Sequence, residues 1–298
     1  MNNKTLITVV GPTAIGKTAM AIQLAQHFDT DIISSDSRQF YKEMYIGTAV
    51  PNPYELVQAK HHFIQHKSIF DPYSVGDFEK EATELLTDLF LEKDQVVMAG
   101  GSGLYVNAVV DGLDDFPEVD PKIRQKLNKE LDEKGIESLQ EQLKSLDPNH
   151  YKNVDILNPH RIIRALEISL GTGKPYSSFL KNKKANRAFK SVKIGLTADR
   201  EVIYDRINKR VDIMMDNGLL GEAKALYPHR NLNALQTVGY KELFEFFDGN
   251  WTLDFAISEI KKNTRRFAKR QLTWFRKDPS IHWFDYTSPV EEIIRDIE

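Results

Sequence analysis

Gly11-Pro12-Thr13-Ala14-Ile15-Gly16-Lys17-Thr18 is the segment of this 298-residue chain that decides the fold. A glycine, four further residues and then Gly-Lys-Thr give it the spacing of a P-loop. In such a loop the glycines let the backbone fold around phosphate oxygens, and the N–H groups at the start of the next helix attract the negative charge. Lys17 is expected to pair with the distal phosphate, and Thr18 to place its hydroxyl on a Mg²⁺ ion. The segment therefore predicts a site for a phosphorylated substrate.

Strands and helices alternate around this loop. Leu6 to Val10 is a short apolar run that predicts a buried strand, and the apolar residues of Lys17 to Phe28 have helical spacing. Further strands are predicted at 32–33, 95–99 and 192–196, and further helices at 77–92, 200–217 and 254–276. This alternation is typical of a parallel sheet covered by helices on both faces. We therefore predict an α/β fold with a P-loop three-layer, parallel-sheet core.

The segment from 116 to 190 interrupts the alternation, because it contains helical patterns with no strand between them. Three of its helices are predicted to begin at a capping residue followed by proline: Asp120-Pro121, Asp147-Pro148 and Asn158-Pro159. We predict two domains: a P-loop catalytic core made of residues 1–115 and 191–298, and an inserted helical domain made of residues 116–190.

The composition is that of an ordinary globular protein. Hydrophobic residues make up 41% of the chain and charged residues 28%, which argues against disordered, collagenous and repeat proteins. No apolar run approaches the length of a membrane span, so we expect no membrane association. Cysteine is absent, which excludes disulfides, thiolate zinc sites and cysteine nucleophiles and suits the cytoplasm, where we expect the protein to work.

Basic residues are segregated in two segments, although the net charge is −3. Residues 181–193 contain six lysines and arginines and residues 261–277 contain eight, and neither segment contains an acidic residue. Phe267, Trp274 and Phe275 are interleaved with the second set. Such runs are often solvated helix faces, but two of them in an acidic protein favour a surface for nucleic acid or polyphosphate.

The carboxylate nearest to the P-loop is predicted to be Asp36. A P-loop enzyme that hydrolyses a nucleoside triphosphate normally has an acid at the end of an apolar strand, but the strand at 95–99 runs instead into Gly100-Gly101-Ser102. Asp36 follows the strand at 32–33, and the carboxyl ends of parallel strands line the ligand crevice of an open α/β sheet. The alternative is that Asp36 merely caps a helix or closes a turn.

Two pairs of arginines have helical spacing. Arg161 and Arg164 are three residues apart and could grip phosphates or stack on bases, or remain a solvated surface. Arg206 and Arg210 are four residues apart and could reach the crevice, or simply pair with Asp205 and Glu222. His61-His62 suggests a metal site, but adjacent side chains on a helix diverge, so an ordinary structural role is preferred.

Taken together, these segments resemble the tRNA dimethylallyltransferase family, the isopentenyl transferases that modify the adenosine beside the anticodon. The resemblance covers nearly the whole chain, and the order and spacing of its markers are specific. The markers are GPTAIGKT at 11–18, SSDSRQFYKEMYIGTAVP at 34–51, YSVGDF at 73–78, GGSGLY at 100–105, NPHRIIRALEI at 158–168, TGKP at 172–175, TVGYKE at 237–242 and the basic run at 261–277.

The resemblance implies that the P-loop holds the diphosphate of dimethylallyl diphosphate and that no phosphoryl group is transferred. The N6 amine of adenine would attack the allylic C1 while diphosphate leaves. Lys17, Thr18, Mg²⁺ and Arg210 would stabilise the growing negative charge, with Arg206 as the alternative to Arg210. Asp36 would take the amine proton and orient the amine.

The resemblance also implies contacts to tRNA from both domains. The partner would be the anticodon stem-loop, and the enzyme is expected to act as a monomer because RNA must enter an open channel. The tRNA-binding positions carried over from the family are Asp36, Ser37, Arg38, Gln39, Ser102, Arg124, His160, Arg161, Ile162, Ile163 and Arg164.

Three alternative functions remain open at this point. A P-loop kinase for a small metabolite would share the fold but would need an acid near the γ-phosphate, and none is found apart from Asp36. The related adenylate isopentenyltransferase uses a free nucleotide, so it would not need the helical insertion or the basic run. An RNA-binding module without enzymatic activity would leave the P-loop unexplained.

Overall fold

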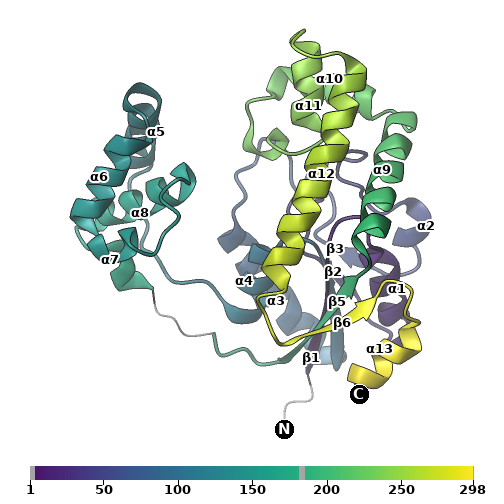
Figure 1. Cartoon of the computed structure of the whole chain (residues 1–298). Helices are drawn as coiled ribbons and strands as arrows, with labels where there is room; N and C mark the ends of the chain where they lie inside the picture. The colour runs from purple at the N-terminus through teal and green to yellow at the C-terminus, as the bar shows by residue number, and fades with distance from the viewer. Residues whose placement is uncertain (1–3, 181–184, 298) are drawn as a thin grey trace. The chain divides into compact units, whose positions relative to one another are not determined.

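The computed structural model describes residues 4–180 and 185–297, which form two compact units (Figure 1). The first unit combines Met1–Asp111 with Asn186–Glu298, and the second is Gly112–Ala185. The second unit is therefore inserted in the sequence of the first, with transitions near 112 and 185 where the sequence placed them near 116 and 190. Within the described ranges, no helix is both long enough and apolar enough to cross a membrane.

The first unit is built on a parallel sheet whose central strand carries the P-loop (Figure 1). The strands are β1 (Thr5–Val10), β2 (Ile32–Ser34), β3 (His61–His62), β4 (Gln95–Ala99), β5 (Lys190–Thr197) and β6 (Ile281–Asp285). They lie in the order β3-β2-β4-β1-β5-β6, and every pair is parallel. The chain winds away from β1 in both directions, so the carboxyl end of β1 is the point at which an open α/β sheet forms its ligand crevice.

Helices cover both faces of this sheet. Alternate side chains of β1 point in opposite directions, so each face carries apolar side chains that a layer of helices buries. Ile7 and Val9 pack with α1 (Lys17–His27), α9 (Arg200–Asp216) and α13 (Val290–Ile297). Leu6 and Val10 pack on the other face with α3 (Val75–Glu92) and α4 (Gly103–Asp111). The long helix α12 (Leu253–Phe275) contributes Ala268 to the first cluster and Phe275 to the second. The predicted three-layer α/β core is confirmed.

A further helical cluster lies beyond the sheet in the same unit. It joins α9 and α12 to α10 (Leu219–Leu226) and α11 (Tyr240–Phe247), around the buried residues Leu219, Leu235 and Tyr240. The unit also contains the short helix α2 (Pro53–Leu56) and 3₁₀ turns at Tyr227–His229 and Asn233–Leu235. Neither α10 nor α11 was predicted from the sequence.

The second unit is helical. Its helices are α5 (Pro121–Lys134), α6 (Ile136–Leu146), α7 (Pro148–Tyr151) and α8 (Pro159–Thr172), followed by a 3₁₀ turn at Tyr176–Phe179. The three predicted caps are confirmed, since the side chains of Asp120, Asp147 and Asn158 each accept a hydrogen bond from a backbone N–H in the first turn. Leu127, Leu143 and Leu166 lie in the buried core that these helices share.

The predicted helices and strands differ from those observed by at most two residues at either end. His61 and His62 depart from expectation in another way, because they form the edge strand β3 and not part of a helix. His62 Nε2 lies 2.7 Å from Asp31 Oδ2, and His61 Nδ1 lies 2.8 Å from the Ala59 carbonyl oxygen. In residues 4–180 and 185–297, no group of three or more His, Asp or Glu residues is placed to hold a metal ion. The structural role of the two histidines stays a prediction, and these two contacts support it.

Two members of the first basic segment, Arg187 and Lys193, have partners within the protein. Lys181, Lys183 and Lys184 lie outside the described residues. Arg187 Nη2 donates to Glu79 Oε1 and to the Ala108 carbonyl. Lys193 is 5% exposed and its Nζ lies 2.6 Å from Asp278 Oδ2. The prediction of a nucleic-acid surface is therefore wrong for Arg187 and Lys193, because each of these cations is paired with a carboxylate of the protein.

The Lys193–Asp278 pair provides a test of the core. We expect Asp278→Asn to lower the free energy of unfolding by about 3 kcal/mol, because it leaves Lys193 buried with only the distant Asp111 carboxylate, 3.9 Å away. Urea unfolding measures this loss. Asp296→Asn, which breaks an exposed pair with His282, is the control and is expected to cost less than about 1 kcal/mol. Equal losses from the two variants would contradict this account.

The same pair makes stability depend on acid pH. Burial opposes ionisation of Asp278, but hydrogen bonds from Lys193 and Ser280 outweigh it and lower its pKa from 3.8 to about 2. Its stabilising contribution is therefore complete above about pH 4 and is lost as the pH falls towards 2.

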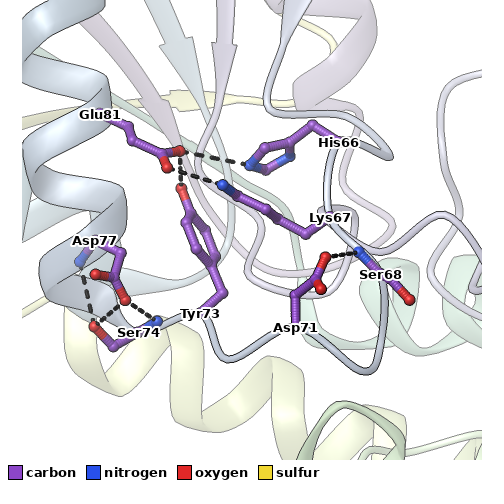
Figure 2. Close-up of polar contacts among 8 residues, drawn as sticks. All are labelled: His66, Lys67, Ser68, Asp71, Tyr73, Ser74, Asp77 and Glu81. Atoms are coloured by element: carbon purple, nitrogen blue, oxygen red, sulfur yellow. Dashed lines mark hydrogen bonds and ion pairs between the residues drawn. The ribbon is translucent and has the colours of Figure 1, made fainter.

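The family marker at 73–78 forms the start of α3 (Figure 2). Ser74 Oγ accepts from the Asp77 N–H while Asp77 accepts from the Ser74 N–H, which is a capping box. One turn later, Glu81 accepts hydrogen bonds from Lys67 Nζ and the Tyr73 hydroxyl, each at 2.8 Å. Figure 2 shows Lys67, Tyr73 and His66 pointing toward this carboxylate. The marker therefore has a structural role in the first unit.

Candidate active site

The P-loop turns sharply between β1 and α1. Gly11 has a φ of 145°, and a Cβ there would lie 2.5 Å from the Leu196 carbonyl oxygen of β5. Gly16, with a φ of 113°, is the N-cap residue that directly precedes α1. Both positions need glycine, the first because the neighbouring backbone is too close for a side chain and the second because its backbone is left-handed. The loop therefore presents the amino end of α1 to a cavity, as the sequence predicted.

Lys17 is held inside this loop. Its Nζ donates to the Pro12 carbonyl oxygen at 2.8 Å. Burial lowers its pKa from 10.5 to about 8, Asp36 acts in the opposite direction, and Arg210 lowers it further. The lowered pKa shows that this environment disfavours the charged form of Lys17. An anion bound beside it would offset that cost, so the environment of Lys17 suits a phosphate group.

Arg206 and Arg210 both reach the P-loop from α9. Arg206 Nε donates to the Ala14 carbonyl oxygen at 2.7 Å, and its guanidinium lies 4.8 Å from the centre of the Tyr286 ring. Arg210 Nη1 lies 3.4 Å from Thr13 Oγ1. Burial lowers the pKa of Arg210, and Asp36 opposes this shift. The alternative in which these arginines pair with Asp205 and Glu222 is wrong.

Asp205 instead pairs with Lys209. Glu222 holds the loop at residues 45–47 in place. The Glu222 carboxylate accepts from the backbone N–H groups of residues 45, 46 and 47 at 2.8–3.0 Å, and from the Tyr240 hydroxyl at 2.7 Å. This loop lines the cavities next to the P-loop. Sequence reasoning missed this function of Glu222, because the loop and α10 are about 175 residues apart.

Gln271 is a second residue that sequence reasoning missed. This buried side chain of α12 accepts from the Thr13 N–H at 2.8 Å and donates to the Gly101 carbonyl oxygen at 2.9 Å. It thereby joins the P-loop to the loop that follows β4. A Cβ on Gly101 would lie 2.2 Å from Gln271 Nε2 and 3.7 Å from Lys17 Nζ, so the glycine is needed for this close approach.

Asp36 lies just beyond the carboxyl end of β2, between two cavities. The first cavity, about 740 Å³, is lined by the P-loop, the loop at 45–52 and the α9 arginines. The second, about 640 Å³, is lined by residues 101–105, by residues 236–239 and by α12. The residues that line both are Thr13, Asp36, Thr48, Ala49, Arg210 and Met214. The carboxylate is therefore shared by the cavity of the P-loop and by the second cavity.

The residues after Asp36 hold neighbouring loops in place. Ser37 Oγ and Ser102 Oγ are 3.1 Å apart. Arg38 Nη1 donates to the carbonyl oxygens of Asn233 and Ala234, each at 3.0 Å. Gln39 Nε2 donates to carbonyls of the loop at 48–49. Ser37, Arg38 and Ser102 line the second cavity, whereas Gln39 lines the first. Their contacts with tRNA remain predictions.

In the second unit the predicted arginines share one carboxylate. Arg124 donates to both oxygens of Glu167, at 3.0 and 2.7 Å, and Arg164 Nη1 lies 3.1 Å from Oε2. Burial opposes ionisation of Glu167, but these hydrogen bonds outweigh it and lower its pKa. His160 and Arg161 are exposed at the start of α8.

Ile162 and Ile163 require a correction. Their exposed fractions are 0% and 3%, and both lie in the core of the second unit. Their side chains therefore pack this unit, and burial leaves no surface for the predicted contact with tRNA. The family marker at 158–168 therefore contains residues of two kinds. One face of the helix presents arginines, and the other buries apolar residues in the core of the second unit.

Comparisons with known proteins agree with this geometry. A family model described as IPP transferase matches residues 39–278. The chain is 64% identical to a tRNA dimethylallyltransferase of Christiangramia forsetii, over 98% of this chain and 97% of that protein. It is 60% identical to the tRNA dimethylallyltransferase of Flavobacterium johnsoniae, over 98% and 96%.

Solved structures are similar as well. The full-length tRNA isopentenylpyrophosphate transferase of Bacillus halodurans is 40% identical with a TM-score of 0.71, and the match covers 99% of this chain and 94% of that one. A eukaryotic dimethylallyltransferase acting on tRNA is 27% identical with a TM-score of 0.79, over 96% of this chain and 74% of that one.

Proposed function

Because this chain belongs to the IPP transferase family and transfers a dimethylallyl group to tRNA, we propose that its two cavities hold the two substrates on either side of Asp36. Dimethylallyl diphosphate would occupy the cavity of the P-loop, and the target adenine would occupy the second cavity. The observation that carries this assignment is that Asp36, Thr13 and Arg210 line both cavities.

The reaction then follows from the positions of these groups. The N6 amine of adenine attacks C1 of the allyl group, a C–N bond forms, and the bond from C1 to the diphosphate oxygen breaks. The amine proton passes to the Asp36 carboxylate, and diphosphate leaves with the bonding electrons. Lys17 and Arg210 stabilise the charge that develops on the leaving group, because both are half-buried cations that the loop already holds in place, so they cost little reorganisation during the step.

Mg²⁺ is proposed as the cofactor. The Thr18 hydroxyl lies at the cavity of the P-loop and is the side chain that would hold the ion. This donor set fits Mg²⁺, which keeps several waters and is commonly bound by few protein ligands together with substrate phosphates. When bound, the ion would supply further neutralisation of the diphosphate.

Arg210 is the better candidate than Arg206 for the diphosphate. Arg206 already donates to a P-loop carbonyl and lines only the first cavity, whereas Arg210 lines both. We expect Arg210→Ala to lower kcat/KM for dimethylallyl diphosphate about 10- to 100-fold, and Arg206→Ala to lower it less. Steady-state kinetics at saturating tRNA measure both effects, and a larger loss from Arg206→Ala would reverse the assignment.

The RNA partner is proposed to be the anticodon stem-loop, and the target the adenosine on the 3′ side of the anticodon. Ser37, Ser102 and Arg38 surround the second cavity, where a base flipped out of the loop would be read. Arg161 and His160 of the second unit are exposed and would contact the RNA backbone. The enzyme is proposed to act as a cytoplasmic monomer.

An isolated stem-loop RNA tests this proposal. The wild-type protein is expected to transfer the dimethylallyl group to the stem-loop at a rate within about tenfold of that with whole tRNA. A matched stem-loop with inosine at the target position should accept none, because inosine lacks the N6 amine. Transfer to the inosine RNA, or to another adenosine, would contradict the assignment.

A further inference from the structure

The loop at residues 45–50 reaches both cavities. Tyr45, Ile46 and Val50 line the cavity of the P-loop and residue 47 lines the second, whereas residues 48 and 49 line both. In the proposed function, the C–N bond forms where the two cavities meet. The path of this loop therefore helps to set the distance between the two reacting atoms.

Glu222 holds the loop from outside the cavities. Its Oε2 accepts from the N–H groups of Tyr45 and Ile46, at 3.0 and 2.8 Å, and its Oε1 accepts from the Gly47 N–H at 2.9 Å. Glu222 itself lines neither cavity. Three successive N–H groups converge on one carboxylate only when the backbone curves around it, so Glu222 fixes the shape of this turn.

Tyr240 completes the contact. Its hydroxyl donates to Glu222 Oε1 at 2.7 Å, and burial together with this carboxylate raises its pKa, so the hydroxyl stays a donor. A Cβ on Gly47 would lie 2.6 Å from both Cζ and Oη of Tyr240, so the phenol lies directly against the backbone of the loop. Tyr240 and its neighbours Leu219 and Ala223 on α10 are each 0% exposed. Both side chains that hold the loop therefore stand on a buried core.

The other end of the loop is tied to the segment of Asp36. Gln39 Nε2 donates to the carbonyl oxygens of Thr48 and Ala49, and its Oε1 accepts from the Ser34 hydroxyl at 3.2 Å. Ser34 Oγ in turn accepts from the Asp36 N–H at 3.4 Å. Ala49 has a φ of 52°, a left-handed conformation that costs free energy in a residue with a side chain. Contacts on both sides of Ala49 hold the loop in this conformation.

We propose that Glu222 is a positioning residue for dimethylallyl transfer, which acts through the loop at 45–49 and, together with Tyr240, fixes the passage between the two cavities. This inference rests on the proposed function of those cavities. Glu222 would contact neither substrate, so its effect should fall on the chemical step and not on the binding of either substrate. A displacement of about 1 Å between reacting groups can slow a reaction about 10²-fold.

Glu222→Gln tests the need for a carboxylate. Glutamine has a single acceptor oxygen, so in either orientation its amide NH₂ would face at least one backbone N–H of the loop and leave that donor unpaired. We expect single-turnover transfer to the anticodon stem-loop, with both substrates saturating, to be about 10- to 100-fold slower. The dissociation constants for inorganic diphosphate and for the stem-loop should stay within about threefold, because the P-loop and the RNA-facing side chains are unchanged.

Glu43→Gln is the matched control. Glu43 likewise accepts from a hydroxyl and a backbone N–H, those of Ser68 and Ile69, but it lines neither cavity and holds a different loop. Its single-turnover rate should equal that of the wild type. Thermal unfolding midpoints of both variants show that the rates are compared between folded proteins.

Chemical rescue separates a positioning role from a merely structural one. In Glu222→Ala the three N–H groups and the Tyr240 hydroxyl lose their common acceptor, and formate supplies two oxygens of the same geometry. Sodium formate is expected to restore the single-turnover rate of Glu222→Ala about tenfold, within the range that positioning supplies. Sodium chloride at the same ionic strength should restore none of it, and formate should not accelerate the wild type.

The outcomes distinguish this inference from the proposed function. Wild-type rates in both Glu222 variants, an equal loss in Glu43→Gln, or a loss that lies in the two dissociation constants would overturn the positioning role and leave the proposed function intact. The absence of rescue by formate would also contradict it. A wild-type protein that transfers nothing to the stem-loop would overturn the proposed function together with this inference.

Discussion

Replacing Asp36 with asparagine is expected to slow dimethylallyl transfer about 10²- to 10⁴-fold, the range of a general base. Asparagine has the shape of aspartate and can still accept the Arg38 N–H that now binds Oδ1 at 3.1 Å, but it cannot take up the amine proton. The dissociation constant for tRNA should stay within a few fold, because the loop around Asp36 keeps its hydrogen bonds. Single-turnover rates and filter binding measure the two quantities.

Asp31→Asn is the control for this variant. Asp31 lies at the opposite end of β2 and pairs with His62, so its loss should leave the chemical step unchanged. Turnover by Asp36→Asn close to that of the wild type would remove Asp36 from the role of base. A large loss of tRNA binding would instead make it a binding residue.

Lys17→Met is expected to reduce kcat/KM for dimethylallyl diphosphate about 10²- to 10³-fold, because it removes the cation that we propose to stabilise the leaving group. The affinity for tRNA should change little, since Lys17 lines only the first cavity. Lys209→Met is the matched control, because Lys209 is exposed on α9 and pairs with Asp205. An equal loss in the two variants would mean that Lys17 has no specific role.

The pH dependence of diphosphate binding gives a second test of Lys17. Burial and Arg210 lower its pKa to about 8 in the free protein, against the opposing effect of Asp36. Only the protonated amine attracts the diphosphate, so affinity should fall as the pH rises above about 8 and should be nearly constant below it. Calorimetric titration measures this, and Lys17→Met should abolish the dependence.

The core of the fold was predictable because its signals are local. The P-loop, the short apolar strands and the Asp-Pro and Asn-Pro caps each act within a few residues, and the structure has them where the sequence placed them. The edge strands β3 and β6 were missed, since the sequence of neither shows a continuous apolar run like that of β1 or β4.

The residues of the site could be predicted only where a side chain and its neighbours in sequence indicate a specific chemical role. Lys17 and Asp36 could be named, but Gln271 and Glu222 act through partners more than 170 residues away. Arg187 and Lys193 misled for the same reason, because the carboxylates of Glu79 and Asp278 that neutralise them are remote in sequence. Ile162 and Ile163 were assigned to RNA through the family resemblance, and their burial corrects this.

The central claim is that this chain transfers a dimethylallyl group to one adenosine of tRNA. Nucleoside mass spectrometry tests it most directly, on unmodified tRNA incubated with the protein, Mg²⁺ and dimethylallyl diphosphate, with AMP present as a competing acceptor. We predict a gain of one dimethylallyl group, confined to the adenosine on the 3′ side of the anticodon. A gain on AMP alone, or on neither acceptor, would contradict the account.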